Sequence, residues 1–310
     1  MKKVAVVFPG QGSQGVGMGL DLFENFDEAK AVYKEASEAL NYDIGKLCFT
    51  GPKDELNKTF RTQPALLTTS VAAYRVMLSK GIKPEMLAGH SLGEYSALVA
   101  AGVLTLPAAV KLTEMRGKFM QEAVPEGHGL MAAILGLDRG SVDNICLQVK
   151  SGYVAAANYN CPEQTVIAGE KHAVDEAIKL AKDAGAKRAI PLAVSVPSHC
   201  TLMVGASEQL SKYFEGITFK NAEIPIVNNA DAMVLLKADQ IKASLIRQLN
   251  SPLLWEDSVK KMVDTGVEVF VEVGPITVLS GLIKRIDSSV TILNVQDSVS
   301  LERTVAALNN

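Results

Sequence analysis

The sequence is poor in cysteine and has no marked excess of charge of either sign, and each shortage excludes a class of protein. The four cysteines, Cys48, Cys146, Cys161 and Cys200, form no Cys-x-x-Cys pair and no set with histidine at metal-ligand spacing. We therefore expect no disulfide framework, no metal site and a reducing, cytoplasmic location. Lysine and arginine number 31 against 34 aspartates and glutamates, so no global field attracts nucleic acid.

Long hydrophobic runs are missing as well. The apolar run that starts at Val4 lasts five residues, up to Pro9, which is too short for a signal peptide or for a membrane span of about 20 residues. The sequence thus predicts a soluble protein that is not secreted. Its 310 residues, 48% of them hydrophobic, suffice for one large core or for a core and a smaller lobe.

Strand-like segments alternate with helical ones along most of the chain. This order predicts an α/β fold with a mostly parallel sheet that helices cover on both faces. The expected strands are 4–8, 86–89, 224–227, 267–273 and 291–295. The expected helices are 26–40, 64–78, 92–101, 107–123, 202–214, 239–262 with a break at Pro252, and 276–286.

The middle of the chain follows a different order. Segments 130–135, 153–158, 165–168 and 188–194 read as strands, and segments 141–148 and 172–184 read as helices. Strand, helix, strand, strand, helix, strand is the split pattern of a ferredoxin-like unit. Because glycine and proline flank it, we predict a ferredoxin-like small subdomain at 125–197, inserted into a larger core formed by 1–124 and 198–310.

The sharpest local signal is the Gly-x-Ser-x-Gly sequence from Gly89 to Gly93, which stands between a predicted strand and a predicted helix. A nucleophile elbow requires this context. The tight turn needs glycines on both sides of the serine, since a Cβ there would clash. The pattern therefore predicts that Ser91 is a nucleophile, raised above the sheet at a helix N-terminus.

A glycine-rich loop follows the first strand. Gly10, Gly12 and Gly15 match the Gly-x-Gly-x-x-Gly pattern of dinucleotide sites. Pro9 interrupts the strand-to-loop junction, and further glycines stand where the helix of such a site should begin. We interpret the match as fortuitous, and expect instead a loop that turns a main-chain N–H toward an oxyanion.

Four histidines could act as the base. His90 adjoins Ser91 and should turn away from it, His128 lies in a glycine-rich hinge, and His172 starts a predicted helix. His199 follows a buried-looking strand, where such folds build sites. The residues alone leave the choice open. A long stretch of chain follows His199, unlike in ordinary α/β-hydrolases, so the group that orients it should lie there, and a carbonyl oxygen suffices.

Five separated motifs together resemble the malonyl-CoA:acyl-carrier-protein transacylase family of fatty acid synthesis, almost end to end. They are FPGQGSQ from Phe8, GHSLGEYSAL from Gly89, EMRGKFMQ around Arg116, VSVPSHCTLM around His199, and RQLNSPLLW followed by EVGP. The resemblance implies that residues 1–124 and 198–310 form an α/β-hydrolase-like catalytic core with a ferredoxin-like insertion. It also implies that Ser91 is the acylated nucleophile and His199 the general base. It implies that the main-chain N–H groups of Gln11 and Leu92 form the oxyanion hole.

The same resemblance assigns residues on the substrate side. Arg116 would clamp the free malonyl carboxylate with two charge-assisted bonds, which a lysine could not do. Gln248 would orient His199 through its carbonyl, and Asn160 would line the crevice from the small lobe. Ser198 departs from the phenylalanine that many malonyl-selective polyketide enzymes carry, so strict exclusion of methylmalonyl is not expected.

The family's reaction needs no metal and no redox cofactor, because CoA and the phosphopantetheine arm are substrates. Its partners would be malonyl-CoA and acyl carrier protein, and we expect the acidic carrier to meet a local cationic rim at Lys187, Arg188, Lys284 and Arg285. Two alternative functions fit part of this pattern. A serine esterase or thioesterase would use the same elbow with water as acceptor, and a carrier-docking module would have lost the chemistry.

Overall fold

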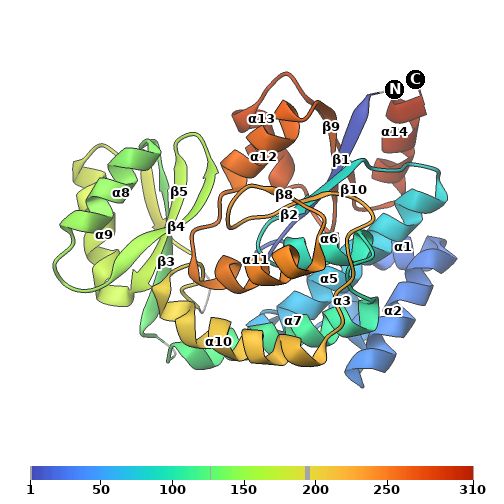
Figure 1. The fold of residues 1–310 in the computed structure, drawn as a ribbon, viewed down its shortest axis with the longest axis horizontal. Coiled ribbons are helices and arrows are strands. Elements are labelled where there is room, and N and C mark those ends of the chain that lie inside the picture. The colour runs from blue at the N-terminus through green and yellow to red at the C-terminus, as the bar shows by residue number, and fades with distance from the viewer. Residues whose placement is uncertain (1, 126, 193–195, 310) are drawn as a thin grey trace.

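The computed structural model describes residues 2–125, 127–192 and 196–309, and its strands form two separate sheets with helices packed against each (Figure 1). The α/β prediction is confirmed. The larger sheet has the order β10-β9-β1-β2-β7-β8, and all its pairs are parallel except β7 with β8. Its strands are β1 (Lys3–Phe8), β2 (Met86–Gly89), β7 (Ile226–Val227), β8 (Val234–Leu235), β9 (Val267–Val273) and β10 (Thr291–Val295).

Strand β1 lies inside this sheet and is buried on both faces. Val6 and Phe8 pack into one core, whereas Ala5 and Val7 pack into the other, because successive side chains of a strand point to opposite faces. The helices of this part are α1 (Leu20–Asn25), α2 (Asp27–Leu40), α3 (Ile44–Thr50), α4 (Lys53–Leu56), α5 (Thr59–Ser79), α6 (Leu92–Ala100), α7 (Leu106–Ala123), α10 (Val204–Tyr213), α11 (Ala238–Asn250), α12 (Trp255–Asp264), α13 (Leu279–Ile286) and α14 (Ser298–Asn309).

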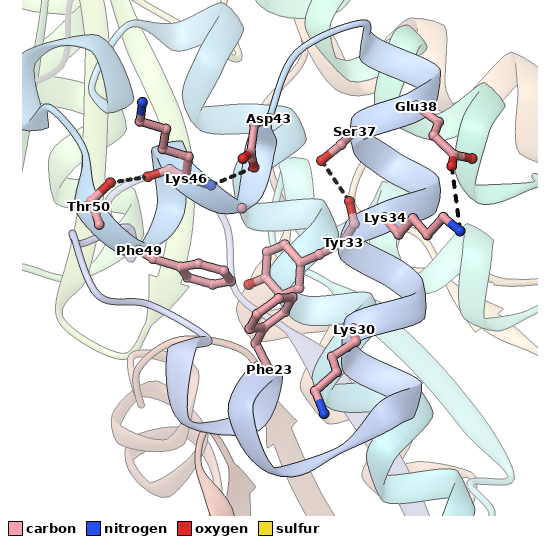
Figure 2. A pocket seen from close by; sticks show the side chains of 11 residues that line it. Phe23, Lys30, Tyr33, Lys34, Ser37, Glu38, Asp43, Lys46, Phe49 and Thr50 are labelled. Atoms are coloured by element: carbon pink, nitrogen blue, oxygen red, sulfur yellow. Dashed lines mark hydrogen bonds and ion pairs between the residues drawn. The ribbon is translucent and has the colours of Figure 1, made fainter.

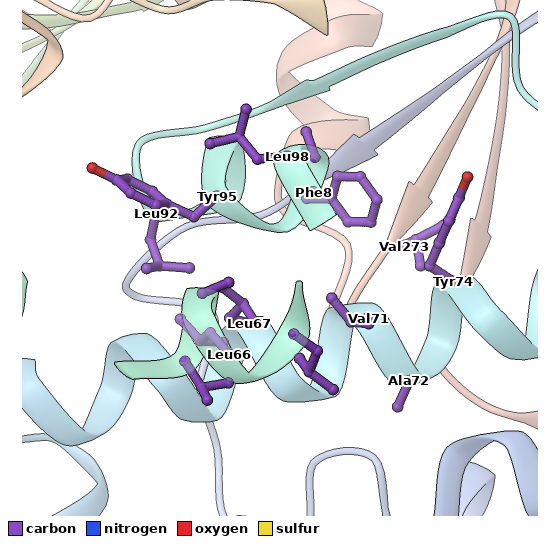
Figure 3. Close-up of a cluster of buried hydrophobic side chains, with 14 of the residues drawn as sticks. Phe8, Leu66, Leu67, Val71, Ala72, Tyr74, Leu92, Tyr95, Leu98 and Val273 are labelled. Atoms are coloured by element: carbon purple, nitrogen blue, oxygen red, sulfur yellow. The ribbon is translucent and has the colours of Figure 1, made fainter. Parts of the chain in front are cut away.

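The larger core fixes α6 in place. Figure 3 shows Leu66 and Leu67 of α5 directed toward Leu92 and Tyr95 of α6, with Phe8 of β1 beside them. All five side chains are buried, and each apolar side chain that leaves water contributes roughly 1.5–3 kcal/mol to folding. The turn that connects β2 to α6 is therefore held by packing on the helix that follows it.

Helix α5 differs from the prediction, and the predicted helix break is confirmed. Helix α5 begins at Thr59, five residues before the predicted start at Pro64. Pro64 lacks only one helical N–H, and the buried face that runs from Thr59 to Met77 outweighs that loss. The predicted break at Pro252 is confirmed, since α11 ends at Asn250 and α12 begins at Trp255. No helix in the described ranges is long and apolar enough to cross a membrane.

The smaller sheet belongs to the middle of the chain. Its strands pair antiparallel in the order β4-β5-β3-β6, and two helices pack on one of its faces, as a ferredoxin-like unit requires. They are β3 (Gly129–Leu135), α8 (Arg139–Gln148), β4 (Val154–Cys161), β5 (Gln164–Glu170), α9 (Lys171–Asp183) and β6 (Arg188–Pro191). The predicted end of the last strand, 193–194, lies outside the described residues, and we propose 125–197 as the limits of this subdomain.

Main-chain hydrogen bonds near the site join the small sheet to the larger part of the molecule. Strand β4 pairs with Leu253, which lies between α11 and α12: the Leu253 N–H donates to the Ala157 carbonyl at 2.7 Å, and the Tyr159 N–H donates to the Leu253 carbonyl at 2.9 Å. Met131 and Val166, from the face of the small sheet that carries no helices, line the cavity described below. The small subdomain thereby forms one wall of the candidate site.

Candidate active site

Ser91 occupies a tight turn between β2 and α6. Its φ is 52°, a conformation that a residue with a side chain rarely adopts. A Cβ on Gly89 would lie 1.9 Å from the Gly93 carbonyl carbon, and a Cβ on Gly93 would lie 2.0 Å from the Phe8 carbonyl oxygen. The Gly-x-Ser-x-Gly pattern is therefore a packing requirement of this turn, and the turn sets Ser91 at the N-terminus of α6.

His199 lies beside the Ser91 hydroxyl. Its Nε2 is 2.8 Å from Ser91 Oγ, and its Nδ1 is 2.7 Å from the main-chain carbonyl oxygen of Gln248. A carbonyl can only accept, so Nδ1 carries the proton and Nε2 is left to accept from the serine. The imidazole, 1% exposed, is thus in the tautomer that a general base needs.

Arg116 of α7 is also 1% exposed, and its guanidinium faces Ser91. Nη1 donates to Gln63 Oε1 at 2.8 Å, while Nη2 donates to Gln248 Oε1 at 3.1 Å and to Ser91 Oγ at 3.3 Å. These partners are all neutral, and no salt bridge within the described part of the chain includes Arg116. A buried cation without a contacting carboxylate is costly, so the site is suited to an anionic ligand.

These side chains converge on a cavity of about 90 Å³. Gln11 enters it from the loop after β1, and its Nε2 donates to Thr59 Oγ1 at 3.3 Å. Leu92 is the first residue of α6, so its main-chain N–H has no partner within the helix. The residues that line the cavity are Gln11, His90, Ser91, Arg116, Met120, Met131, Asn158, Val166, Leu192, Val196, Ser198 and His199.

Comparison with known proteins agrees with this chemistry. Residues 5–305 match the acyl transferase domain family. The malonyl CoA-acyl carrier protein transacylase of Haemophilus influenzae is 53% identical over 303 residues, 97% of each chain. The enzyme of the same name from Bacillus subtilis is 45% identical over 310 residues, 99% of this chain and 98% of that one. The chain belongs to the malonyl CoA-acyl carrier protein transacylase family.

Solved structures of this transacylase family have the same fold. An acyl carrier protein S-malonyltransferase from Vibrio cholerae shares 49% identity, with a TM-score of 0.95 over 97% of this chain and 99% of that one. A malonyl-transacylase solved in complex with its type II PKS acyl-carrier protein also shares 49% identity, with a TM-score of 0.96 over 99% of this chain and all of the other.

Burial controls the ionisation of the groups around Ser91. It lowers the pKa of His199 to about 3, with a further contribution from the Arg116 cation, so this imidazole is neutral near pH 7 and free to accept a proton. Burial also raises the pKa of Glu94, on the first turn of α6, to about 7, although hydrogen bonds from Gln248 and Asn229 lower it. The pKa of His90 is lowered by the same cause.

Two asparagines of β4 differ in what they contact. Asn160 Oδ1 accepts from His90 Nε2 at 2.9 Å, so Asn160 holds the histidine that precedes the nucleophile in the chain. Asn158, two residues earlier, lines the cavity with an amide oxygen that has no hydrogen-bond partner among the described residues. Only Asn160 was predicted from the sequence. Asn158 is two residues away on the same strand, and residues at this spacing lie on the same face, so the strand pattern indicates both asparagines.

Sequence reasoning also missed Asn229. Its Oδ1 accepts from the Ser91 N–H at 2.7 Å, and its Nδ2 donates to the Gly89 carbonyl at 2.8 Å. Asn229 follows β7 at the carboxyl end of that strand, the edge where parallel sheets build their sites, and this position was the available signal. Among the described residues, no group of three or more histidine, cysteine and acidic side chains could hold a metal.

Proposed function

We propose that this chain transfers the malonyl group of malonyl-CoA to the phosphopantetheine thiol of acyl carrier protein, through a malonyl ester on Ser91, and so supplies the extender unit for fatty acid synthesis. The family and the polar groups around Ser91 support this function. Relatives named as malonyl CoA-acyl carrier protein transacylases cover nearly the whole chain, and one malonyl-transacylase of known structure is in complex with its carrier.

In the first half-reaction, His199 Nε2 accepts the Ser91 proton while Oγ attacks the thioester carbon of malonyl-CoA. The N–H groups of Gln11 and Leu92 stabilise the oxyanion that forms on the former carbonyl oxygen. The carbon–sulfur bond then breaks, and the CoA sulfur leaves with the proton that His199 had accepted. Neutral His199 and a malonyl-serine ester remain.

In the second half-reaction, the carrier's thiol replaces CoA. His199 accepts the thiol proton, the thiolate attacks the ester carbon, and Ser91 leaves with that proton. Gln248 keeps His199 in one tautomer through both steps, because its carbonyl accepts from Nδ1 at 2.7 Å. Kinetics of the ping-pong type follow, since CoA must leave before the carrier's arm enters.

The observation that carries the substrate assignment is the buried Arg116 beside the nucleophile. A guanidinium can hold the free carboxylate of a malonyl group in a two-pronged arrangement. Its Nη2 lies 3.3 Å from Ser91 Oγ, and its buried Nε has no hydrogen-bond partner in the part of the chain that the structure describes. An acyl group that ends in a methyl would leave this cation without a counter-charge.

The carrier and the cellular setting complete the proposal. Four free cysteines fit a reducing cytoplasm. Of the cationic rim, Lys187 pairs with Glu163 at 3.0 Å, and Arg285 donates to Gln164 Oε1 at 2.8 Å, so these two cations are partly engaged within the chain. We therefore expect Arg188 and Lys284 to contribute more to the attraction of an acidic carrier.

The test is a two-step mass measurement. The protein is incubated with malonyl-CoA, its intact mass is recorded, and holo acyl carrier protein is then added. We expect a malonyl adduct that the carrier removes and that water releases slowly. An adduct that decays to free malonate equally fast without carrier would assign the chain to the thioesterases, and no adduct at all would remove the acyl-serine mechanism.

A further inference from the structure

Glu94 is a buried carboxyl group that the proposed reaction does not use. It is 2% exposed, and its Oε2 accepts from the main-chain N–H of Asn229 at 3.0 Å and from Gln248 Nε2 at 2.9 Å. A carboxyl group in such a place must be held by donors, because its desolvation is costly. Both of its donors belong to residues that also contact the main chain of Ser91.

The amide groups of Asn229 and Gln248 hold the two polar main-chain atoms of Ser91. Asn229 Oδ1 accepts from the Ser91 N–H at 2.7 Å, and Gln248 Nε2 donates to the Ser91 carbonyl at 3.0 Å. An amide has a donor end and an acceptor end, so its neighbours decide which end faces the serine. Glu94 accepts from Nε2 of Gln248, and Arg116 Nη2 donates to Oε1 of the same amide at 3.1 Å. Together they fix the orientation in which the Gln248 NH₂ group faces the Ser91 carbonyl.

The main chain of Ser91 needs such support. Its φ of 52° is sparsely populated, and a residue persists there only where its surroundings over-determine the conformation. We infer that Glu94 is a positioning residue of the nucleophile: it fixes the main chain of Asn229 and orients the side-chain amide of Gln248, and these two residues keep Ser91 in the strained turn that aims Oγ at His199. This inference rests on the proposed role of Ser91.

The inference predicts a loss that does not depend on the acyl group. Without the Glu94 acceptor, the Gln248 amide and the Asn229 N–H lose a shared partner, and the Ser91 turn relaxes. A displacement of about 1 Å at a reacting atom can cost about 100-fold in rate. Loading with malonyl and with acetyl groups should therefore fall together, and so should the reaction of Ser91 with a fluorophosphonate, which needs the hydroxyl and its base but no carboxylate clamp.

The variants are Glu94→Met, which keeps the volume and removes both oxygens, and Glu94→Gln, which keeps one acceptor oxygen. Glu272→Gln is the matched control. Glu272 is also 2% exposed and accepts from the main chain of Val278, Leu279 and Ser280, so it holds the start of α13, and within the described part of the chain its side-chain hydrogen bonds include none to a site residue. Folding is checked by circular dichroism, and each adduct on Ser91 is timed by intact mass.

We expect fluorophosphonate labelling of the folded Glu94→Met variant to slow about 100-fold, Glu94→Gln to recover part of that loss, and Glu272→Gln to label at the wild-type rate. Wild-type labelling by Glu94→Met would overturn the inference. If Glu94→Met does not fold, the Glu94→Gln variant tests the inference. Labelling and acyl loading of Glu94→Gln at wild-type rates would then overturn the inference. If the wild-type chain forms neither adduct, the proposed function fails instead of the inference.

Discussion

Two cavities of this chain differ in size and in chemistry. The larger, about 900 Å³, lies among α1, α2 and α3, whereas the cavity at Ser91 measures about 90 Å³. Figure 2 shows the rings of Phe23, Tyr33 and Phe49 close together among the lining residues, with polar groups that bond to each other around them. Its polar groups satisfy one another: Lys34 pairs with Glu38 at 4.0 Å, and Asp43 accepts from the Lys46 N–H at 2.7 Å.

The smaller cavity has the opposite character. Its serine has a base beside it at 2.8 Å, and among the described residues the hydrogen-bond partners of its arginine are all neutral. The cavity lies at the carboxyl end of the parallel strands, where loops from several strands meet. Size is therefore a poor guide to the site in this fold. A nucleophile, a base and an uncompensated buried charge that converge on one cavity are a better guide to the functional site. Variants in the two cavities should therefore differ in their effect on activity.

Ser91→Ala has the largest expected effect. The malonyl adduct should disappear, because Ser91 Oγ, 2.8 Å from His199 Nε2, is the atom that forms the acyl ester in the proposed mechanism. The melting temperature should change little, since the lost hydroxyl contributes little packing. Intact-mass spectra after incubation with malonyl-CoA give the result. An adduct that survives on the variant would place the nucleophile elsewhere, and the larger cavity would then have to be searched for it.

His199→Ala should slow both half-reactions by about 10²- to 10⁴-fold, the range for loss of general base help. The pKa of this imidazole, lowered to about 3 by burial, keeps it neutral and ready to accept a proton at neutral pH. Rapid-quench kinetics with malonyl-CoA, and separately with holo carrier on preloaded enzyme, measure the two steps. A loss confined to the CoA step would require a second base for the carrier's thiol.

Arg116→Ala separates a malonyl-selective enzyme from a general acyl-serine enzyme. It removes one partner of a charge-assisted pair, and malonyl loading should lose roughly 2 to 5 kcal/mol of transition-state stabilisation. Acetyl loading should stay level or rise, because acetyl-CoA brings no carboxylate and the uncompensated cation is gone. Arg116→Lys should recover part of the malonyl loading, since an ammonium keeps the charge without the planar fork.

The measurement is the ratio of malonyl to acetyl adduct on Ser91 after a short fixed time at equal acyl-CoA concentrations. Wild type and both Arg116 variants are compared. A ratio that Arg116→Ala leaves unchanged would show that the buried cation does not recognise the acyl group, and the contrast between the two cavities would then rest on Ser91 and His199 alone.

Much of the fold followed from local patterns, and the failures have physical reasons. Strands β2, β9 and β10 have the predicted bounds, because each is a short and mostly apolar run, which is the pattern typical of a strand. Helices α3 and α4 have seven and four residues, too few for a period to be visible, and such short helices depend on caps and tertiary packing. Asp43 caps α3 in this way.

The site was predictable where one residue type implies one chemistry. Ser91 stands in a turn whose glycines are required by space, and a family resemblance pointed to His199 and Arg116. The role of Gln248 in orienting His199 belongs to its main-chain carbonyl, which any residue has, so its side chain carries no signal for it. Glu94 and Asn229 act through burial and through the direction of an amide, and neither property is visible before the chain is folded.

The smallest effect on activity is expected from Phe49→Ala, in the larger cavity. The Phe49 ring packs 4.8 Å from the rings of Phe23 and Tyr33 but is only partly buried. Truncation should therefore lower the free energy of unfolding by about 1–3 kcal/mol, less than the 3–5 kcal/mol of a fully buried phenylalanine. Malonyl loading at a temperature where the variant is folded should equal that of wild type, because no group of this cavity takes part in the proposed reaction.

Ser91→Ala provides the reverse pattern, with loading lost and stability kept. Urea unfolding and intact-mass loading on the same preparations test both halves, and a Phe49→Ala variant that is folded but loads slowly would show that the two cavities are coupled through α2 and α5.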